Sequence, residues 1–157
     1  MNRLTALHAE LIVVDPAPLI HLASCGLLVK LVNFGKVIVV DIVEIEVTRE
    51  LTKPFAAEIN AWLKAETCAG RVEIGETPTG ETYRLALKVY PEYRQRDAGE
   101  IAIASWLYEH IESTETQTLV LYEDLKVLKL LKNLLKECDV SLVSTRAFLK
   151  LCEKVGR

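Results

Sequence analysis

The stretch LIVVDPAPLIHLA, residues 11–23, decides the fold because it predicts a strand, a turn and a helix in direct succession. Its first four residues are apolar and three of them are β-branched, which predicts a buried strand. The strand ends at Asp15, and Pro18 suits the first turn of a helix that ends near Gly26. A carboxylate directly after a buried strand is either a turn residue or part of a site, and this stretch alone leaves both interpretations open.

The succession of strand and helix recurs along the chain. Four more strands are expected, at 37–40, 71–74, 118–122 and 140–144, and the one at 71–74 suits a sheet edge. Further segments with helical spacing lie between and after them, at 42–51, 54–66, 79–93, 97–111, 125–137 and 145–155, and Pro91 is expected to end the helix in the third of these. Continuous apolar strands that alternate with helices predict an α/β fold, a three-layer sandwich around a central, mostly parallel sheet.

The composition limits the class of protein. The chain has 157 residues, of which 50% are hydrophobic, so we expect one domain over residues 1–157 with a core of its own. A net charge of −3 argues against a surface that binds polyanions everywhere. The four cysteines and three histidines lack the spacing of a zinc site or a CxxC pair, and we interpret them as packing residues in a reducing compartment.

The sequence gives no sign of a membrane segment. No stretch reaches the roughly 18 apolar residues that a membrane-spanning helix needs. The short apolar run near the N-terminus is closed by Asp15, and no small-residue cleavage pattern follows it. We therefore predict a cytoplasmic protein without a signal peptide.

Several acids lie where predicted strands end. In a parallel sheet, ligands bind beyond the carboxyl ends of the strands, and Asp15, Asp41 and the pair Glu123–Asp124 lie at such ends. Acids in this position also cap the helices that follow. The capping role is the weaker one for Asp15, because the predicted helix begins only near Pro18. For Asp124 the two roles carry comparable weight.

Two further acids lie on predicted helices. Glu46 falls within the apolar stripe of the helix at 42–51, where a charge is either partnered or functional. Glu50 lies close to the same face, so the pattern does not choose between the two. Glu100 lies in the first turn of a helix that is apolar nearly all round and should be buried. It fits a capping box with Asp97 as well as a site, and both roles stay open.

As a cluster, these acids indicate a function more clearly than any one of them does alone. Carboxylates that gather within a few ångströms repel and raise one another's pKa, and a hard divalent cation removes the conflict. Mg²⁺ and Mn²⁺ take oxygen ligands, activate water and stabilise charge on a phosphate. An acidic cleft without histidine or cysteine ligands therefore favours phosphodiester hydrolysis over zinc chemistry.

Five blocks of the sequence, in order, resemble the blocks of PIN domains. They are VVDPAPLIHLA (13–23), VDIVEIEVTREL (40–51), DAGEIAIASWL (97–107), LVLYEDLKVLKLL (119–131) and VSLVSTRAFLKL (140–151), and they cover nearly the whole chain. The resemblance implies a single-domain α/β fold with a central parallel sheet. It also implies a ribonuclease that uses Mg²⁺ or Mn²⁺, with catalytic and metal-binding residues at Asp15, Glu46, Glu100 and Asp124. Many such proteins are toxins that a small antitoxin protein inhibits, and many form homodimers.

The chain departs from the family pattern at two places. The family commonly has Thr-Ser after the first aspartate, where this chain has Pro16–Ala17, so a hydroxyl that could orient a water is replaced. The late acidic pair is commonly Asp-Asp, and here it is Glu123–Asp124, of which Asp124 aligns with the metal site.

A nuclease must also hold its substrate. Arg94 and Arg96 in PEYRQRD are the candidate RNA-binding residues, because arginine contacts phosphates and the nearby Tyr90 and Tyr93 could stack on unpaired bases. The lysines after Asp124, at positions 126, 129 and 132, are better interpreted as one solvated helix face.

The function predicted from the sequence is that of a metal-dependent endoribonuclease acting on single-stranded or structured RNA, as the toxin of a toxin–antitoxin pair. The alternative is a catalytically impaired PIN-fold protein that binds RNA or protein, which the Pro16–Ala17 pair suggests. A phosphatase is disfavoured because Ala17 stands where its second aspartate is needed, and a receiver domain because its acidic pair, phospho-accepting aspartate and lysine cannot be assembled. No glycine-rich phosphate loop is present.

Overall fold

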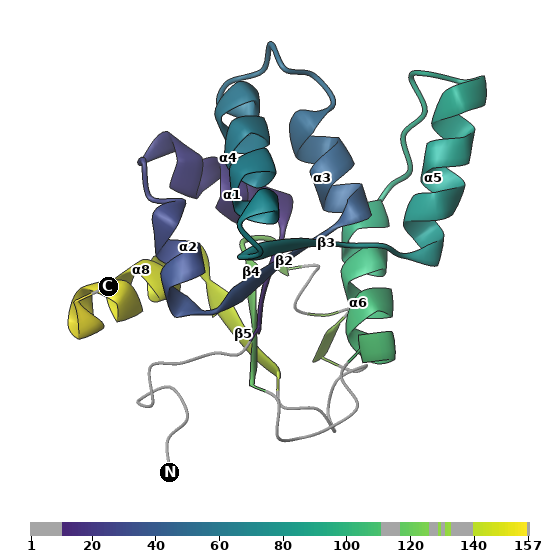
Figure 1. Cartoon of the computed structure of the whole chain (residues 1–157). Coiled ribbons are helices and arrows are strands. Elements are labelled where there is room, and N and C mark those ends of the chain that lie inside the picture. The colour runs from purple at the N-terminus through teal and green to yellow at the C-terminus, as the bar shows by residue number, and fades with distance from the viewer. Residues whose placement is uncertain (1–10, 111–116, 126–128, 130, 133–139, 157) are drawn as a thin grey trace.

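A computed structural model describes residues 11–110, 117–125, 129, 131–132 and 140–156. These residues form one sheet of five strands, all parallel, in the order β3-β2-β1-β4-β5 (Figure 1). The strands are β1 (Leu11–Val14), β2 (Lys36–Val40), β3 (Val72–Gly75), β4 (Thr118–Tyr122) and β5 (Val140–Ser144). The predicted α/β fold with a central parallel sheet is confirmed, and so is the expected edge strand, which is β3.

The strand order places β1 at the centre of the sheet. From β1 the chain moves outward to β2 and β3, then returns to the other side of β1 and moves outward again through β4 and β5. The point at which this direction reverses lies between β1 and β4, and such reversal points leave a crevice at the carboxyl ends of the strands. The register pairs Val14 with Leu121, and the backbone N–H of Asp15 donates to the Leu121 carbonyl at 3.1 Å. Asp15 therefore lies at the reversal point of the sheet.

Helices cover both faces of the sheet. The described helices are α1 (Pro16–Ser24), α2 (Val29–Phe34), α3 (Asp41–Thr48), α4 (Ala56–Cys68), α5 (Pro78–Val89), α6 (Ala98–His110) and α8 (Thr145–Val155). α1 packs against α3, α4 and α8, whereas α5 packs against α6. In Figure 1, α6 and α8 lie on opposite sides of the strands. Because both faces are covered, the residues of the central strands are buried whichever way their side chains point.

The core follows from this double cover. All but one of the residues of β1 are buried, and so are all residues of β2 after Lys36. Phe34 of α2 meets Phe148 of α8 edge to face, with ring centroids 5.1 Å apart. Continuous apolar strands are what a sheet buried on both sides requires, which is why the β-branched runs predict it.

Several predicted boundaries shift. α1 begins at Pro16 rather than near Pro18, because proline has the right φ for a first helical residue and its missing N–H is not needed there. α5 ends at Val89, as expected of a helix that Pro91 ends, since the residue before a proline disfavours helical geometry. Most of the predicted helix at 125–137, including Lys126, lies outside the described residues. Lys129 and Lys132 are exposed, as expected of a solvated face. None of the described helices is long and apolar enough to cross a membrane.

Asp41 is a strand-end acid that holds the fold together. It begins α3 directly after β2 and is only 2% exposed. Its carboxylate accepts hydrogen bonds from the backbone N–H of Thr77 at 3.0 Å, from the Thr77 hydroxyl at 2.8 Å and from Nη1 of Arg84 at 2.7 Å. Asp41 thereby ties the end of β2 to the start of α5, and it is a structural residue rather than a part of the acidic site.

Gly80 makes this contact possible. It lies in the first turn of α5, where its backbone N–H donates to the Thr77 hydroxyl at 3.0 Å. A Cβ atom at this position would overlap the carboxylate of Asp41. Only glycine lets the helix approach Asp41 so closely.

We expect Gly80→Ala to lower the free energy of unfolding by about 1–3 kcal/mol, the usual cost of overpacking a buried contact. Gly99→Ala is the matched control, because Gly99 is also in the first turn of a helix and its Cβ would find ordinary contact at 3.4 Å. That variant should be neutral or gain up to about 1 kcal/mol from helix propensity. Urea titration of both variants measures the difference, and equal stabilities would contradict the role given to Gly80.

Candidate functional site

Asp15 occupies the N-cap position of α1 but does not cap the helix. Its backbone is extended, with φ −79° and ψ 163°, as in an N-cap residue, yet its side chain makes no capping hydrogen bond within the described residues. A capping side chain normally accepts from the second or third backbone N–H of the helix, and the third residue here is Pro18, which has none. The sequence-based start of this helix was wrong, but the carboxylate is free of the capping role.

The Asp15 carboxylate is also buried without a partner. The residue is 5% exposed, and Oδ1 has no hydrogen-bond partner in the part of the chain that the structure describes. A buried polar atom in this state costs about 1–3 kcal/mol, so it marks a position kept for something other than stability.

Glu46, not Glu50, belongs to the same site. Glu50 pairs on the surface with Nη2 of Arg94 at 2.9 Å and with Nζ of Lys53 at 3.6 Å. The Glu46 carboxylate instead lies against the start of α6, where a Cβ on Gly99 would be 3.4 Å from its Oε1. This contact with a distant segment distinguishes Glu46 from Glu50, although helical periodicity places both on one face.

Glu100 comes to the site from the first turn of α6. The capping box with Asp97, one of the two roles left open by the sequence, does not form, because neither carboxylate has a hydrogen bond among the described residues. The reason is local, since Asp97 has the left-handed φ of 58° and a capping residue needs an extended backbone. Glu100 is half-buried, and it is the carboxylate that raises the pKa of Asp15 most strongly.

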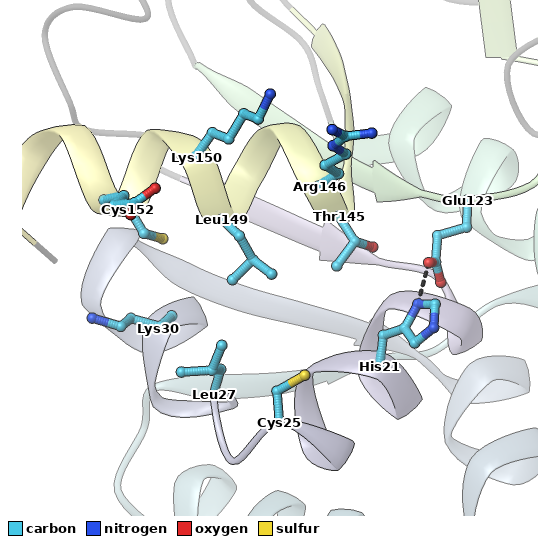
Figure 2. Close-up of a pocket in the computed structure, with 11 residues that line it drawn as sticks. His21, Cys25, Leu27, Lys30, Glu123, Thr145, Arg146, Leu149, Lys150 and Cys152 are labelled. Carbon is cyan, nitrogen blue, oxygen red and sulfur yellow. Dashed lines mark hydrogen bonds and ion pairs between the residues drawn. The ribbon is translucent and has the colours of Figure 1, made fainter.

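The two acids that follow β4, Glu123 and Asp124, have different surroundings. Oε1 of Glu123 is bonded to Nδ1 of His21 on α1 (Figure 2). Asp124 is exposed, and it raises the pKa of Asp15 more than Glu123 does. The charge of Asp124 thus acts on Asp15 more strongly than that of Glu123, which is bonded to α1.

The four predicted acids act on one another electrostatically. Burial is the largest cause that raises the pKa of Asp15, followed by the charges of Glu100, Glu46, Asp124 and Glu123 in that order, and together they raise it from 3.8 to about 7. Burial and the charge of Glu100 likewise raise the pKa of Glu46 to about 7, against the opposing charge of Arg94. Although burial acts on its carboxylate, the Glu46 residue as a whole is exposed, so solvent screens its interactions and the pKa of the buried Asp15 reports the cluster better.

A cleft of about 650 Å³ is lined by Glu46, one of the four acids, and by both predicted RNA-binding residues. Its other lining residues are Pro16, Ile20, Val47, Tyr83 and Gln95. Both arginines are exposed. The structure thus places Arg94 and Arg96 in one cleft with Glu46.

Sequence reasoning missed the contacts that hold the arginine loop. Arg49 donates from Nη1 to the Tyr83 hydroxyl at 3.1 Å and from Nη2 to the Pro91 carbonyl at 2.7 Å. The Tyr83 hydroxyl donates to the Tyr93 carbonyl at 3.2 Å, and the two tyrosine rings meet edge to face. Tyr93 is therefore a packing residue, and Tyr90, which is 60% exposed, is the tyrosine open to a base. Bonds between residues so far apart in the sequence leave no local pattern.

The donor set of the site consists of oxygen atoms, as Mg²⁺ and Mn²⁺ prefer. The carboxylates are near enough to shift one another's pKa, but no three His, Cys, Asp or Glu side chains within the described residues stand at the spacing of a metal site. Glu46 and Glu100 have the longer side chains, so rotation of these two would be the way to close the group around an ion at Asp15.

The raised pKa of Asp15 predicts a pH-dependent stability. Between pH 3.8 and about 7 the unfolded chain releases a proton that the folded chain keeps, so the free energy of unfolding falls as the pH rises through this interval. In EDTA at pH 8, we expect Asp15→Asn to be more stable than the wild type by about 1–4 kcal/mol, since a pKa change of one corresponds to about 1.4 kcal/mol. Urea titration at pH 5 and pH 8 measures this.

Glu109→Gln serves as the control for this measurement, because Glu109 is an exposed carboxylate on α6 and should leave the pH profile unchanged. An Asp15→Asn protein that is no more stable than the wild type at pH 8 would contradict the buried, unpaired state of Asp15.

Comparison of the chain with models of protein families, with curated proteins and with solved structures finds no match. The resemblance to PIN domains therefore rests on the five sequence blocks alone.

Proposed function

We propose that the chain is a divalent-metal-dependent endoribonuclease whose site is formed by Asp15, Glu46, Glu100 and Asp124. The observation that carries this proposal is Asp15: a buried carboxylate with an unpaired oxygen, at the reversal point of a parallel sheet, surrounded by other acids. A carboxylate in this state is the expected ligand of a cation, and a cation offsets the repulsion among its neighbours.

The residues present suit Mg²⁺ or Mn²⁺ by their chemistry. Asp15 offers a buried oxygen with no hydrogen bond among the described residues, and Glu46, Glu100 and Asp124 would complete an all-oxygen donor set. Such an ion, when bound, would supply activation of water and stabilisation of charge on a phosphate.

The chain itself supplies binding and orientation. Arg94 and Arg96 would bind the phosphates that flank the cleaved bond, and Arg49 and Tyr83 hold the loop that carries them. Asp15 would need to be deprotonated to act, which predicts little activity below neutral pH.

Cleavage of single-stranded RNA in Mn²⁺ tests the proposal. We expect Asp15→Asn and Glu100→Gln to lower the rate by about 100-fold or more, the scale on which an electrostatic group of an active site contributes. Glu44→Gln is the matched control, because Glu44 lies on α3 two residues before Glu46 but neighbours Asp41 and Arg84 instead of the cluster. It should retain the wild-type rate. Equal cleavage by wild type and Asp15→Asn would show that the activity belongs elsewhere.

A second candidate function is a non-catalytic protein that keeps the fold and binds RNA or protein. It is motivated by Pro16–Ala17, which provides no hydroxyl beside Asp15, and by the lack of preformed metal spacing among the described acids.

Calorimetry with Mn²⁺ separates the two functions. The nuclease proposal predicts binding that is lost or weakened at least about tenfold in Asp15→Asn, since a ligand is removed. The binding-protein alternative predicts no carboxylate-dependent heat in either protein, with no cleavage of RNA.

The toxin role, the small antitoxin, the homodimer and the cytoplasmic location stay predictions. They follow from the resemblance or the composition, and no contact in the structure bears on them. A short upstream reading frame for a DNA-binding antitoxin would support the toxin role.

A further inference from the structure

A second pocket, of about 570 Å³, is lined by Glu123, the neighbour of Asp124 in the chain (Figure 2). Its other lining residues come from α1, from the start of α2 with the residues before it, and from the first three turns of α8. Leu27, Leu149 and Cys25 supply apolar walls, and His21 and Glu123 close one end. The proposed nuclease site makes no use of this pocket beyond sharing the segment that carries Glu123 and Asp124.

Two polar atoms at the closed end have no partner. Tyr122 pairs with Ser144 in the β4–β5 register. Glu123 and Thr145 are the next residues in each segment, so both lie at the ends of these two adjacent strands. Thr145 is 5% exposed, and in the described part of the chain neither its Oγ1 nor Oε2 of Glu123 has a hydrogen-bond partner. Buried oxygens without partners are ligand positions, because leaving them unpaired costs stability.

The open side of the pocket carries positive charge. Lys30 of α2 and Arg146 and Lys150 of α8 line it, against one further acid, Glu153. The pocket also lies at the N-terminus of α8, an eleven-residue helix whose positive end favours anions. Cations at the rim with unpaired oxygens inside suit a molecule that has a phosphate at one end and hydrogen-bond donors at the other.

The pocket and the cleft of Arg94 and Arg96 adjoin different parts of the fold. That cleft adjoins α3 and the loop before α6, whereas the pocket adjoins β5 and α8, and Asp15 on the central strand lies between them. A single strand of RNA that crosses Asp15 would therefore meet cations on both sides.

We propose that this pocket holds an unpaired guanine base of the RNA, next to the phosphodiester at Asp15. The inference rests on the proposed function in one respect, that RNA is the substrate. Guanine presents two adjacent N–H donors, N1–H and the N2 amino group, to the two unpaired oxygens of Glu123 and Thr145. Uracil presents one N–H between two carbonyls, which the carboxylate would repel. The apolar walls would enclose the base, and Lys150 and Arg146 would contact the phosphate beside it.

Binding of short oligoribonucleotides in EDTA tests the pocket without cleavage. The probes are the single-stranded tetranucleotides UUGU, UUIU and UUUU, where I is inosine, which lacks the N2 amino group. We expect the guanine probe to bind about tenfold more tightly than the uracil probe, with inosine between them, because each lost hydrogen bond costs about 1 kcal/mol. Calorimetry or NMR titration measures the affinities.

Three variants assign the preference to its residues. Glu123→Gln should abolish the difference between the guanine and inosine probes while Gln keeps the size of the side chain. Lys150→Ala should weaken all three probes equally, since a phosphate contact is blind to the base. Glu109→Gln should bind like the wild type.

Equal affinity for the guanine and uracil probes, or an unchanged preference in Glu123→Gln, would overturn the proposal. So would a failure of every probe to bind, which would leave the pocket to a protein segment. These outcomes are distinct from failure of the nuclease proposal. A protein that prefers guanine in EDTA but cleaves no RNA in Mn²⁺ would refute only the nuclease, and one that cleaves without base preference would refute only the pocket.

Discussion

The burial of the Asp15 carboxylate is the constraint on which the rest of the structure depends. β1 is the central strand, and its carboxyl end lies where the chain reverses its direction across the sheet. Helices from both faces converge there, so Glu46 comes from α3, Glu100 from α6 and Asp124 from the end of β4. Desolvation and like charge together make the ionised site unfavourable, and a cation is the simplest means of relieving both.

The two aspartates that follow β1 and β2 show how tertiary contacts assign a role to one local sequence. Both strands end in the tripeptide VVD, at 13–15 and 39–41, and both aspartates are buried. Asp41 has its charge satisfied by Thr77 and Arg84, whereas Asp15 has an oxygen that no described residue bonds. One is a structural residue and the other is poised for a ligand, although they end neighbouring strands.

This contrast also marks how far the sequence could predict the molecule. The β-branched runs predicted the five strands and the parallel sheet, because a strand covered on both faces has no polar alternation. The strand ends predicted where the acids would gather. The choice of Glu46 over Glu50 depends on Gly99, and the arginine loop depends on Arg49 and Tyr83, which are contacts between distant segments. The start of α1 was placed two residues late because the two prolines allow the helix to begin at the first of them.

Pro18 has a further consequence for how this chain could evolve or be engineered. It removes one of the two backbone N–H groups that could have donated to the Asp15 carboxylate, the other being that of Ala17. An alanine in its place would restore this donor and should raise the stability of the fold. A selection for heat resistance alone would thus tend to remove this proline.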